Sequence, residues 1–207
     1  MNILITAGAT REPVDAVRFL SNVSTGNTGA ALADACMALG HTVALLRGEG
    51  SVAPRASCPQ ETFSTAVDLW ARLERHLSGG TFDAVVMAAA VSDYRPETVQ
   101  PGKIGSDEAQ RSITLVRNPK ILPQLRAFSP RPVVIVGFKL TAGADAGARL
   151  AAVRAQFATG GVDYVVQIDL YEIRLSPAHP FRLFRSAENP PEEISGPVAL
   201  AERLFKA

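Results

Sequence analysis

The chain has 207 residues, of which 47% are hydrophobic and 20% are charged, and its formal net charge at pH 7 is +1. This length can bury one sizeable core, so we expect a single domain over residues 1–207. The near-zero charge argues against a nucleic-acid partner, and no segment reaches the roughly 18 apolar residues of a membrane span. We therefore expect a cytoplasmic protein with no membrane partner.

Apolar runs alternate with helical patterns along the chain. The patterns predict strands at 2–6, 41–46, 83–91, 132–140, 164–170 and 181–186, and helices at 30–39, 66–77, 119–128, 146–158 and 198–205. Thr65 is the expected cap of the second helix. The 83–91 strand is apolar on both faces, which is typical of a central parallel strand. The alternation predicts an α/β fold with a Rossmann-like, doubly wound, mostly parallel sheet.

A long polar loop, residues 6–29, links the first strand to the first helix. The N-terminus of a helix offers unpaired backbone N–H groups and the positive end of the helix dipole, and Gly26 and Gly29 allow a phosphate to approach them. We therefore predict an anion and nucleotide site at this loop. A Gly29→Val substitution is expected to abolish triphosphate binding and to leave the fold intact.

Ligands of doubly wound sheets bind beyond the carboxyl ends of the strands. The residues that follow the strands here include Arg18 and Asn22, Asp93, and the pair Phe138 and Lys139. Only four of the 21 basic residues are lysines. Lys103, on a Gly- and Pro-bounded loop, and Lys139 could each reach a phosphate, although a solvated surface position explains either lysine equally well.

These residues carry a resemblance to a known family. The segments 5–22 (ITAGATREPVDAVRFLSN), 24–29 (STGNTG), 88–95 (AAAVSDYR), 103–104 (KI), 117–119 (RNP) and 136–140 (VGFKL) together resemble phosphopantothenoylcysteine synthetase, the synthetase domain of the DNA/pantothenate metabolism flavoprotein family. The similarity covers about residues 1–170.

The resemblance implies a ligase of coenzyme A biosynthesis. 4'-Phosphopantothenate would attack a nucleoside triphosphate to form an acyl-nucleotidylate, and the amine of cysteine would then displace the nucleotide. The triphosphate is CTP in most bacterial relatives and ATP in eukaryotic ones, and the choice stays open here. The resemblance also implies Mg²⁺, a homodimer and a separate phosphopantothenoylcysteine decarboxylase as partner; without a decarboxylase half in this chain, no FMN is expected.

The resemblance also implies roles for individual residues. Asn22 and Lys103 would be catalytic, with Asn22 holding the acyl intermediate and Lys103 the reacting phosphate. The expected nucleotide-binding residues are Gly8, Ser24, Thr25, Gly26, Gly29, Ala89, Ala90, Asp93, Asn118, Phe138 and Lys139; Arg18, Asn22, Ala89 and Ala90 would bind substrate, and Asp93 is the candidate Mg²⁺ ligand. Residue by residue, simpler roles compete: Asn22 or Asp93 could shape a turn, and Phe138 could belong to the core.

The C-terminal third departs from the family pattern. Gln156 and Gly160 stand where the family carries basic residues expected to face the triphosphate, and Ile168 stands where the family has asparagine. A non-catalytic relative that binds nucleotide or phosphopantothenate is therefore an alternative. A nicotinamide-dependent reductase is less favoured, because the second strand ends in Arg47-Gly48 rather than in an acid.

Residues 171–195 are the expected dimerisation segment. Phe181, Leu183 and Phe184 form an apolar group inside a Pro-rich stretch. Exposed on a monomer, such a group would favour burial against a second copy. The alternative is that this segment forms an edge strand of the same sheet.

Overall fold

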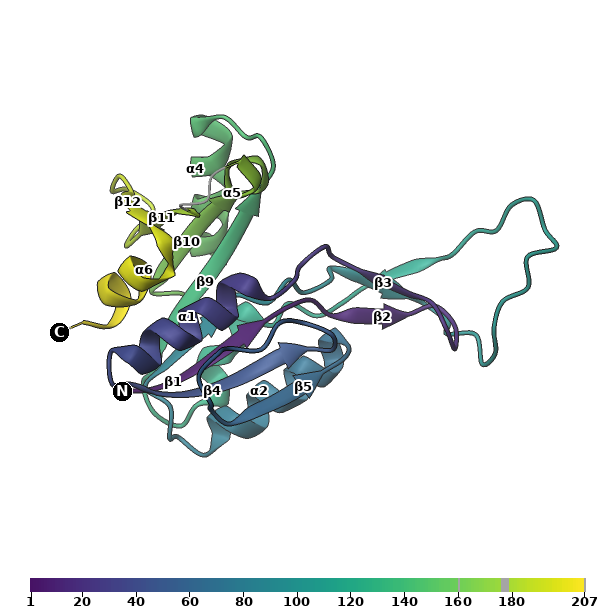
Figure 1. Ribbon diagram of the computed structural model, residues 1–207. Helices are drawn as coiled ribbons and strands as arrows, with labels where there is room; N and C mark the ends of the chain where they lie inside the picture. The colour runs from purple at the N-terminus through teal and green to yellow at the C-terminus, as the bar shows by residue number, and fades with distance from the viewer. Residues whose placement is uncertain (160, 176–178, 207) are drawn as a thin grey trace.

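The structure, a computed structural model, describes residues 1–159, 161–175 and 179–206. The strands of the main sheet are β1 (Asn2–Ala7), β4 (Thr42–Gly48), β5 (Gln60–Phe63), β6 (Ala84–Met87), β9 (Val134–Thr141), β10 (Tyr164–Asp169), β11 (Pro180–Phe184) and β12 (Glu192–Ser195). Within the described chain these eight strands run in the order β12-β11-β10-β9-β6-β1-β4-β5. The strands from β10 to β5 are parallel, and β11 and β12 are added antiparallel (Figure 1). The predicted α/β class with a mostly parallel sheet is confirmed.

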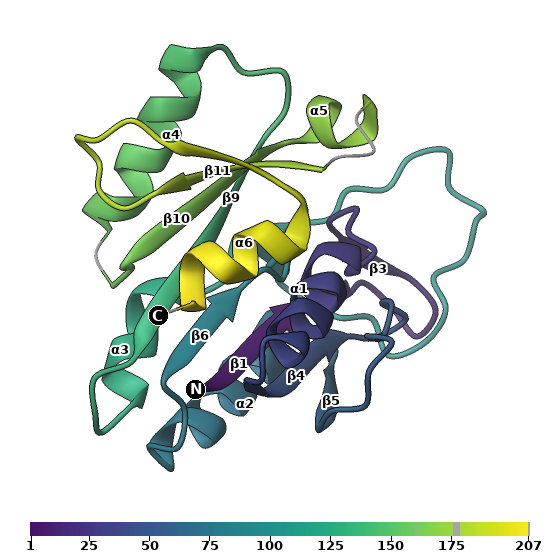
Figure 2. The same cartoon turned by 60° about the vertical axis from the view of Figure 1, so that its left-hand side comes forward.

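Helices cover both faces of the sheet. They are α1 (Asn27–Ala38), α2 (Ala66–Ser78), α3 (Leu125–Phe128), α4 (Ala146–Ala158), α5 (Leu170–Leu175) and α6 (Gly196–Phe205), with a 3₁₀ turn at Leu122–Gln124. α1 and α6 lie together on one face, and α2, α3 and α4 lie on the other (Figure 2). Each face of the sheet has a hydrophobic core, and β1 contributes side chains to both. Ile3 and Ile5 point toward α1, while Leu4 points toward α2. No helix in the described part of the chain is long and apolar enough to cross a membrane.

Two small arms extend from the carboxyl edge of the main sheet. β2 (Arg11–Pro13) pairs with β3 (Phe19–Ser21), and β7 (Tyr94–Pro96) pairs with β8 (Leu115–Arg117). We call these pairs the β2–β3 arm and the β7–β8 arm. Figure 1 shows the β2–β3 arm and the 97–114 segment, which lies between β7 and β8, projecting away from the helices. Their strands of three residues carry no periodic signal, so the sequence did not predict them.

The strand predicted at 83–91 ends four residues early, at Met87. Beyond it the backbone pairs with the loop after β1 instead of with a sheet neighbour: Ala90 N donates to Gly8 O at 2.8 Å, and Thr10 N donates to Ala90 O at 3.2 Å. The loops that follow β1 and β6 are therefore held together at the point where the strand order reverses.

The expected apolar dimerisation patch of the tail is wrong. Phe181, Leu183 and Phe184 are only 0%, 1% and 3% exposed. They lie on β11, which pairs with β10 and places Phe181 and Leu183 in the core under α1 and α6. The segment joins its own sheet instead: β11 is the second strand from the edge, β12 is the edge strand, and the side chains of β11 pack into the cores on both faces.

Candidate functional site

A glycine turn lies at the carboxyl end of β1. Gly8 and Gly26 have φ angles of +80° and +82°, a region that favours glycine. A Cβ on Gly8 would stand 2.7 Å from Ser51 Cβ, and one on Gly26 would stand 2.9 Å from the same atom. The two glycines therefore allow the loop after β1 and the start of α1 to pack onto the turn after β4.

The N-terminus of α1 is bare. Gly26 is its N-cap residue, and no side-chain cap or acidic residue occupies its first turn. Asn27 N donates to Thr25 Oγ1 over a long distance of 3.4 Å. Thr25 O accepts a bond from Val52 N at 2.9 Å, which holds the loop before α1 against the turn after β4. The positive end of the helix dipole is thus not neutralised by an acidic side chain and is available to an anion, while contact of phosphate with Ser24, Thr25 and Gly26 stays a prediction.

Gly29 has a packing role that the sequence did not reveal. It is buried, and a Cβ on it would stand 2.6 Å from Ala7 Cβ and 3.1 Å from Thr6 O. Its missing side chain brings α1 onto β1. The expectation that Gly29→Val spares the fold is therefore corrected, whereas contact of phosphate with Gly29 stays a prediction.

The backbone amides after β6 are already engaged. Ala89 N donates to Thr6 Oγ1 at 3.1 Å, and Ala90 N donates to Gly8 O at 2.8 Å. Ala89 and Ala90 can therefore meet a ligand only through their carbonyl oxygens and methyl groups. The expected backbone contacts of Ala89 and Ala90 with a ligand therefore exclude their N–H groups. The N–H donors of the candidate site are those at the N-terminus of α1.

Asp93 follows β6 on an exposed turn. Its carboxylate forms an ion pair with Lys120 at 2.5 Å, and its backbone O accepts a bond from Asn118 N at 2.8 Å. The side chain of Asn118 is buried, donates to Ser92 O at 3.0 Å and accepts from Arg95 at 3.2 Å. Asn118 thus fixes the Asp93 turn against the β7–β8 arm, and its expected nucleotide contact stays a prediction.

Phe138 and Lys139 point to opposite faces near the carboxyl end of β9. The half-buried Phe138 ring lies on the α1 face and meets Phe181 edge to face, with centroids 6.4 Å apart. Lys139 is half-buried on the face that carries α4. Only Phe138 therefore shares a face with the α1 N-terminus.

Asn22 lies one residue beyond β3, and its side chain is exposed. Its backbone O accepts a bond from Ser21 Oγ at 3.2 Å, but its side-chain amide has no hydrogen-bond partner among the described residues. The alternative role of Asn22, a side-chain bond that shapes a turn, therefore finds no support among the described residues, and the amide is available to a ligand.

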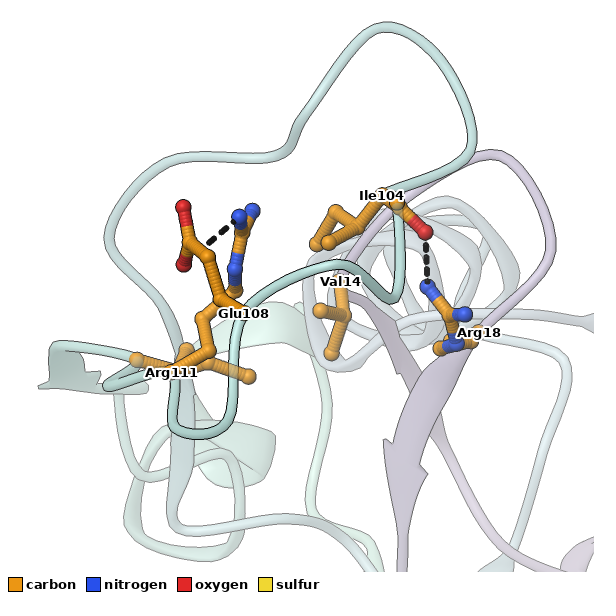
Figure 3. A pocket seen from close by; sticks show the side chains of 7 residues that line it. Val14, Arg18, Ile104, Glu108 and Arg111 are labelled. Carbon is orange, nitrogen blue, oxygen red and sulfur yellow. Dashed lines mark hydrogen bonds and ion pairs between the residues drawn. The ribbon is translucent and has the colours of Figure 1, made fainter.

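Arg18 and Lys103 lie on the projecting part of the molecule. Arg18 forms an ion pair with Asp15 at 2.6 Å. It also donates to Ile104 O at 3.1 Å, as Figure 3 shows. Lys103 is exposed and makes no ion pair with any residue that the structure describes. A cavity of about 220 Å³ lies between the β2–β3 arm and the 97–114 segment, and it is lined by Val14, Arg18, Ile104, Gly105, Glu108, Arg111 and Ile113. Arg18 on the β2–β3 arm and Lys103 on the 97–114 segment are therefore separated from the predicted residues at the α1 terminus, and Lys139 lies on the opposite face of the sheet.

Comparison with known proteins assigns the chain to a family. Residues 1–173 match the family described as "DNA/pantothenate metabolism flavoprotein C-terminal domain". The chain belongs to this family. "Coenzyme A biosynthesis bifunctional protein CoaBC" of Thermococcus kodakarensis is 36% identical over 164 residues, which cover 79% of this chain and 40% of the relative. The chain thus spans less than half the length of this family relative.

Solved structures of the family share the fold. The DNA/pantothenate metabolism flavoprotein from Streptococcus pneumoniae matches with a TM-score of 0.85 and 22% identity, over 99% of this chain and 96% of that one. The C-terminal domain of CoaBC matches with a TM-score of 0.74 and 25% identity, over 99% and 92% of the two chains. The match spans the tail, including β11 and β12.

The departure from the family at residue 156 lies away from the glycine turn. Gln156 is on α4, across the sheet from α1, and its side-chain amide lies against Gly137 and donates to Phe138 O at 3.5 Å. The expectation that the family's basic residue at position 156 faces the triphosphate stays a prediction, and in this chain Gln156 brings no charge to that face. Gly160 lies outside the described residues. Ile168 is a half-buried β10 residue that packs with the α1 face.

Two features of the site were missed by sequence reasoning. Ser51 contacts both positive-φ glycines, and its buried Oγ has no partner among the described residues. Asp15 is a buried carboxylate within an exposed arm. An aspartate in a loop can form a turn by accepting the backbone N–H of the residue two positions later, as Asp15 does with Val17, so the Asp15 turn could have been predicted. No local sequence pattern marks the contact of Ser51 with residues 8 and 26.

Proposed function

We propose that this chain is a phosphopantothenate–cysteine ligase that joins 4'-phosphopantothenate to cysteine through an acyl-nucleotidylate formed from CTP or ATP. The observation that carries the proposal is the family match over residues 1–173, because this range contains every residue assigned to the site. The bare α1 terminus beside Gly8 supplies what the chemistry needs, a fixed set of N–H donors for a polyphosphate.

In the first step the carboxylate of phosphopantothenate attacks the α-phosphorus. A new P–O bond forms to the carboxylate, and the bond to the leaving pyrophosphate breaks. The α1 amides at Gly26 stabilise the charge on the phosphates, and the ammonium of Lys103 stabilises the charge that develops on the reacting group.

In the second step the cysteine amine attacks the acyl carbon. The C–O bond to the nucleoside monophosphate breaks, the amide bond forms, and the amine loses a proton. The exposed amide of Asn22 donates to the acyl oxygen and holds the intermediate while cysteine enters.

Mg²⁺ would neutralise part of the triphosphate charge. No group of three or more His, Cys, Asp or Glu side chains that could hold a metal occurs in the described residues. Asp93 is a single exposed carboxylate, paired with Lys120. One carboxylate suits Mg²⁺ that takes most of its ligands from phosphates and water, so Asp93 would hold it once Lys120 turns away.

The positions of Lys103 and Arg18 support a homodimer. Arg18 belongs to the turn of the β2–β3 arm and Lys103 to the 97–114 segment, and both of these parts project away from α1 (Figure 1). The arms also expose apolar side chains, including Phe19 at 49%, Tyr94 at 45% and Leu115 at 44%. We therefore place the dimer contact on the arms, so that Lys103 and Arg18 of one subunit complete the site of the other.

The deciding experiment is an assay of pyrophosphate release. Phosphopantothenate is supplied with CTP or with ATP, with and without Mg²⁺ and cysteine, and the cysteine adduct is measured by mass spectrometry. We expect release that requires phosphopantothenate and one of the two nucleotides, and adduct only with cysteine. Binding of nucleotide and phosphopantothenate without any release would favour the non-catalytic alternative. A phosphopantothenoylcysteine decarboxylase added in trans would consume the adduct if it is the expected partner.

A further inference from the structure

A buried carboxylate holds the turn of the β2–β3 arm. The side chain of Asp15 is fully buried, although Arg18 beside it is 45% exposed. Asp15 Oδ1 accepts bonds from the backbone N–H groups of Val17 at 2.8 Å and Arg18 at 2.7 Å. Both bonds are local and shape the turn, so they leave Oδ2 for other partners.

Asp15 Oδ2 reaches across to the 97–114 segment. It accepts a bond from Ile104 N at 3.0 Å, and Arg18, paired with the same oxygen, donates to Ile104 O. The N–H and the carbonyl of Ile104, the residue after Lys103, are thus both held by the Asp15–Arg18 pair, and Figure 3 shows the bond from Arg18 to the carbonyl. The backbone bond from Ile104 and the bonds from the turn hold the pKa of Asp15 at about 2, so the carboxylate is charged at neutral pH.

The 97–114 segment has few other attachments to the arm. Gln100 N donates to Val14 O at 3.0 Å, and Ala16 N donates to Gly102 O at 3.4 Å. The ion pair of Glu108 with Arg111 joins two residues of the segment to each other and does not attach it to the arm. Among the described residues, Asp15 and Arg18 are therefore the side chains that fix where Lys103 stands.

We infer that Asp15 is a positioning residue, whose carboxylate holds the Lys103–Ile104 peptide on the β2–β3 arm and thereby sets the position of the Lys103 ammonium for the reaction. The inference rests on the proposed function for its role in the reaction. The attachment of the segment does not depend on that function and can be tested separately.

The attachment is tested by digestion with an endoproteinase that cleaves after lysine. Cleavage of the Lys103–Ile104 bond requires Ile104 N to leave Asp15, so Asp15→Asn is expected to speed that cleavage about tenfold. Asp107→Asn, in the same segment, makes the same charge change without touching the attachment and should cleave at the wild-type rate. Wild-type cleavage of Asp15→Asn at Lys103 overturns the inference, and so does equal acceleration after Lys120 and Lys139, which would mean that Asp15 holds the whole fold.

The role in the reaction is tested by a double-mutant cycle on pyrophosphate release. Asp15→Asn is expected to lower kcat about tenfold when Lys103 is present and to have no effect in a Lys103→Ala background. An equal loss in both backgrounds overturns the inference, because Asp15 would then act without Lys103. If the wild-type chain releases no pyrophosphate, the proposed function fails together with this role, and the digestion alone decides the attachment.

Discussion

The missing side chain of Gly29 faces the Cβ of Ala7, and a Cβ on residue 29 would stand 2.6 Å from it. Helix α1 can therefore lie on β1 only because residue 29 is glycine. The distance also involves backbone, since Thr6 O would be 3.1 Å away, so relaxation of one side chain cannot relieve the contact. This contact sets the position of the α1 N-terminus, where we propose that the phosphates bind.

Gly29→Val is accordingly expected to destabilise the fold by about 1–3 kcal/mol or more through overpacking, in addition to any effect on nucleotide. The free energy of unfolding in urea measures this. Gly102→Ala is the matched control, since a Cβ there meets nothing within 4 Å and should change stability by less than about 0.5 kcal/mol. Equal unfolding midpoints for Gly29→Val and wild type would contradict the packing role.

A negative charge in the first turn of α1 should separate stability from binding. Asn27 is exposed and is the first residue of α1. Asn27→Asp is expected to stabilise the helix by about 0.3–1 kcal/mol through the dipole. It should also weaken CTP or ATP binding about tenfold by repelling the phosphates. Calorimetry and thermal unfolding check both, with Asn189→Asp on the tail as control, and an unchanged nucleotide affinity would move the phosphate site elsewhere.

The two half-reactions should respond differently to Asn22. Asn22→Asp is nearly isosteric, but it replaces an amide donor with an anion beside the acyl-nucleotidylate. We expect the variant to keep part of its pyrophosphate release while forming little cysteine adduct. Parallel assays of both products on one sample provide the measurement. A proportional loss of both products would remove Asn22 from the second step.

Asp169 should make stability depend on pH in the acid range. Burial raises the pKa of Asp169, but hydrogen bonds from Thr141 Oγ1 at 2.7 Å and from the amides of Gly143 and Tyr171 lower it by more. The net result is a pKa of about 2, below the usual 3.8. A lowered folded-state pKa means that the carboxylate stabilises the fold above pH 3.8, and that this contribution disappears as the pH falls toward 2. Asp169→Asn should therefore be less stable than wild type at pH 7, and the gap should narrow at pH 3. A gap that is the same at both pH values would argue against the carboxylate.

The arms and the tail should give opposite results in a test of oligomeric state. Phe19→Ser with Tyr94→Ser removes exposed apolar groups, so it should shift a dimer toward monomer with little loss of chain stability. Phe181→Ser should destabilise the chain by about 3–5 kcal/mol, because its ring is fully buried under α1 and α6. Sedimentation and denaturation distinguish the two. A monomeric wild type at micromolar concentration would end the shared-site proposal.

Periodic elements were predictable from the sequence, and long-range pairings were not. The helix at Ala146–Ala158 and the Thr65 cap, whose side chain accepts from Asp68 N, follow from local patterns and are confirmed. An apolar run such as that of β11 is equally compatible with pairing in its own sheet and with pairing to a second copy. The pairing of Val165 with Phe184 shows that β11 belongs to the sheet of its own chain. The bond from Ile104 to Asp15 joins residues 89 positions apart, which no local pattern encodes.

The tail also decides where the folding unit ends. The family match stops at residue 173, yet β11 covers the edge of β10, and α6 packs Leu200 and Phe205 into the core under α1. A chain cut after residue 173 would leave the β10 edge unpaired and one core open to water. Such a fragment should be prone to edge-to-edge aggregation, so the region that carries the family's sequence signature is shorter than the region that must fold.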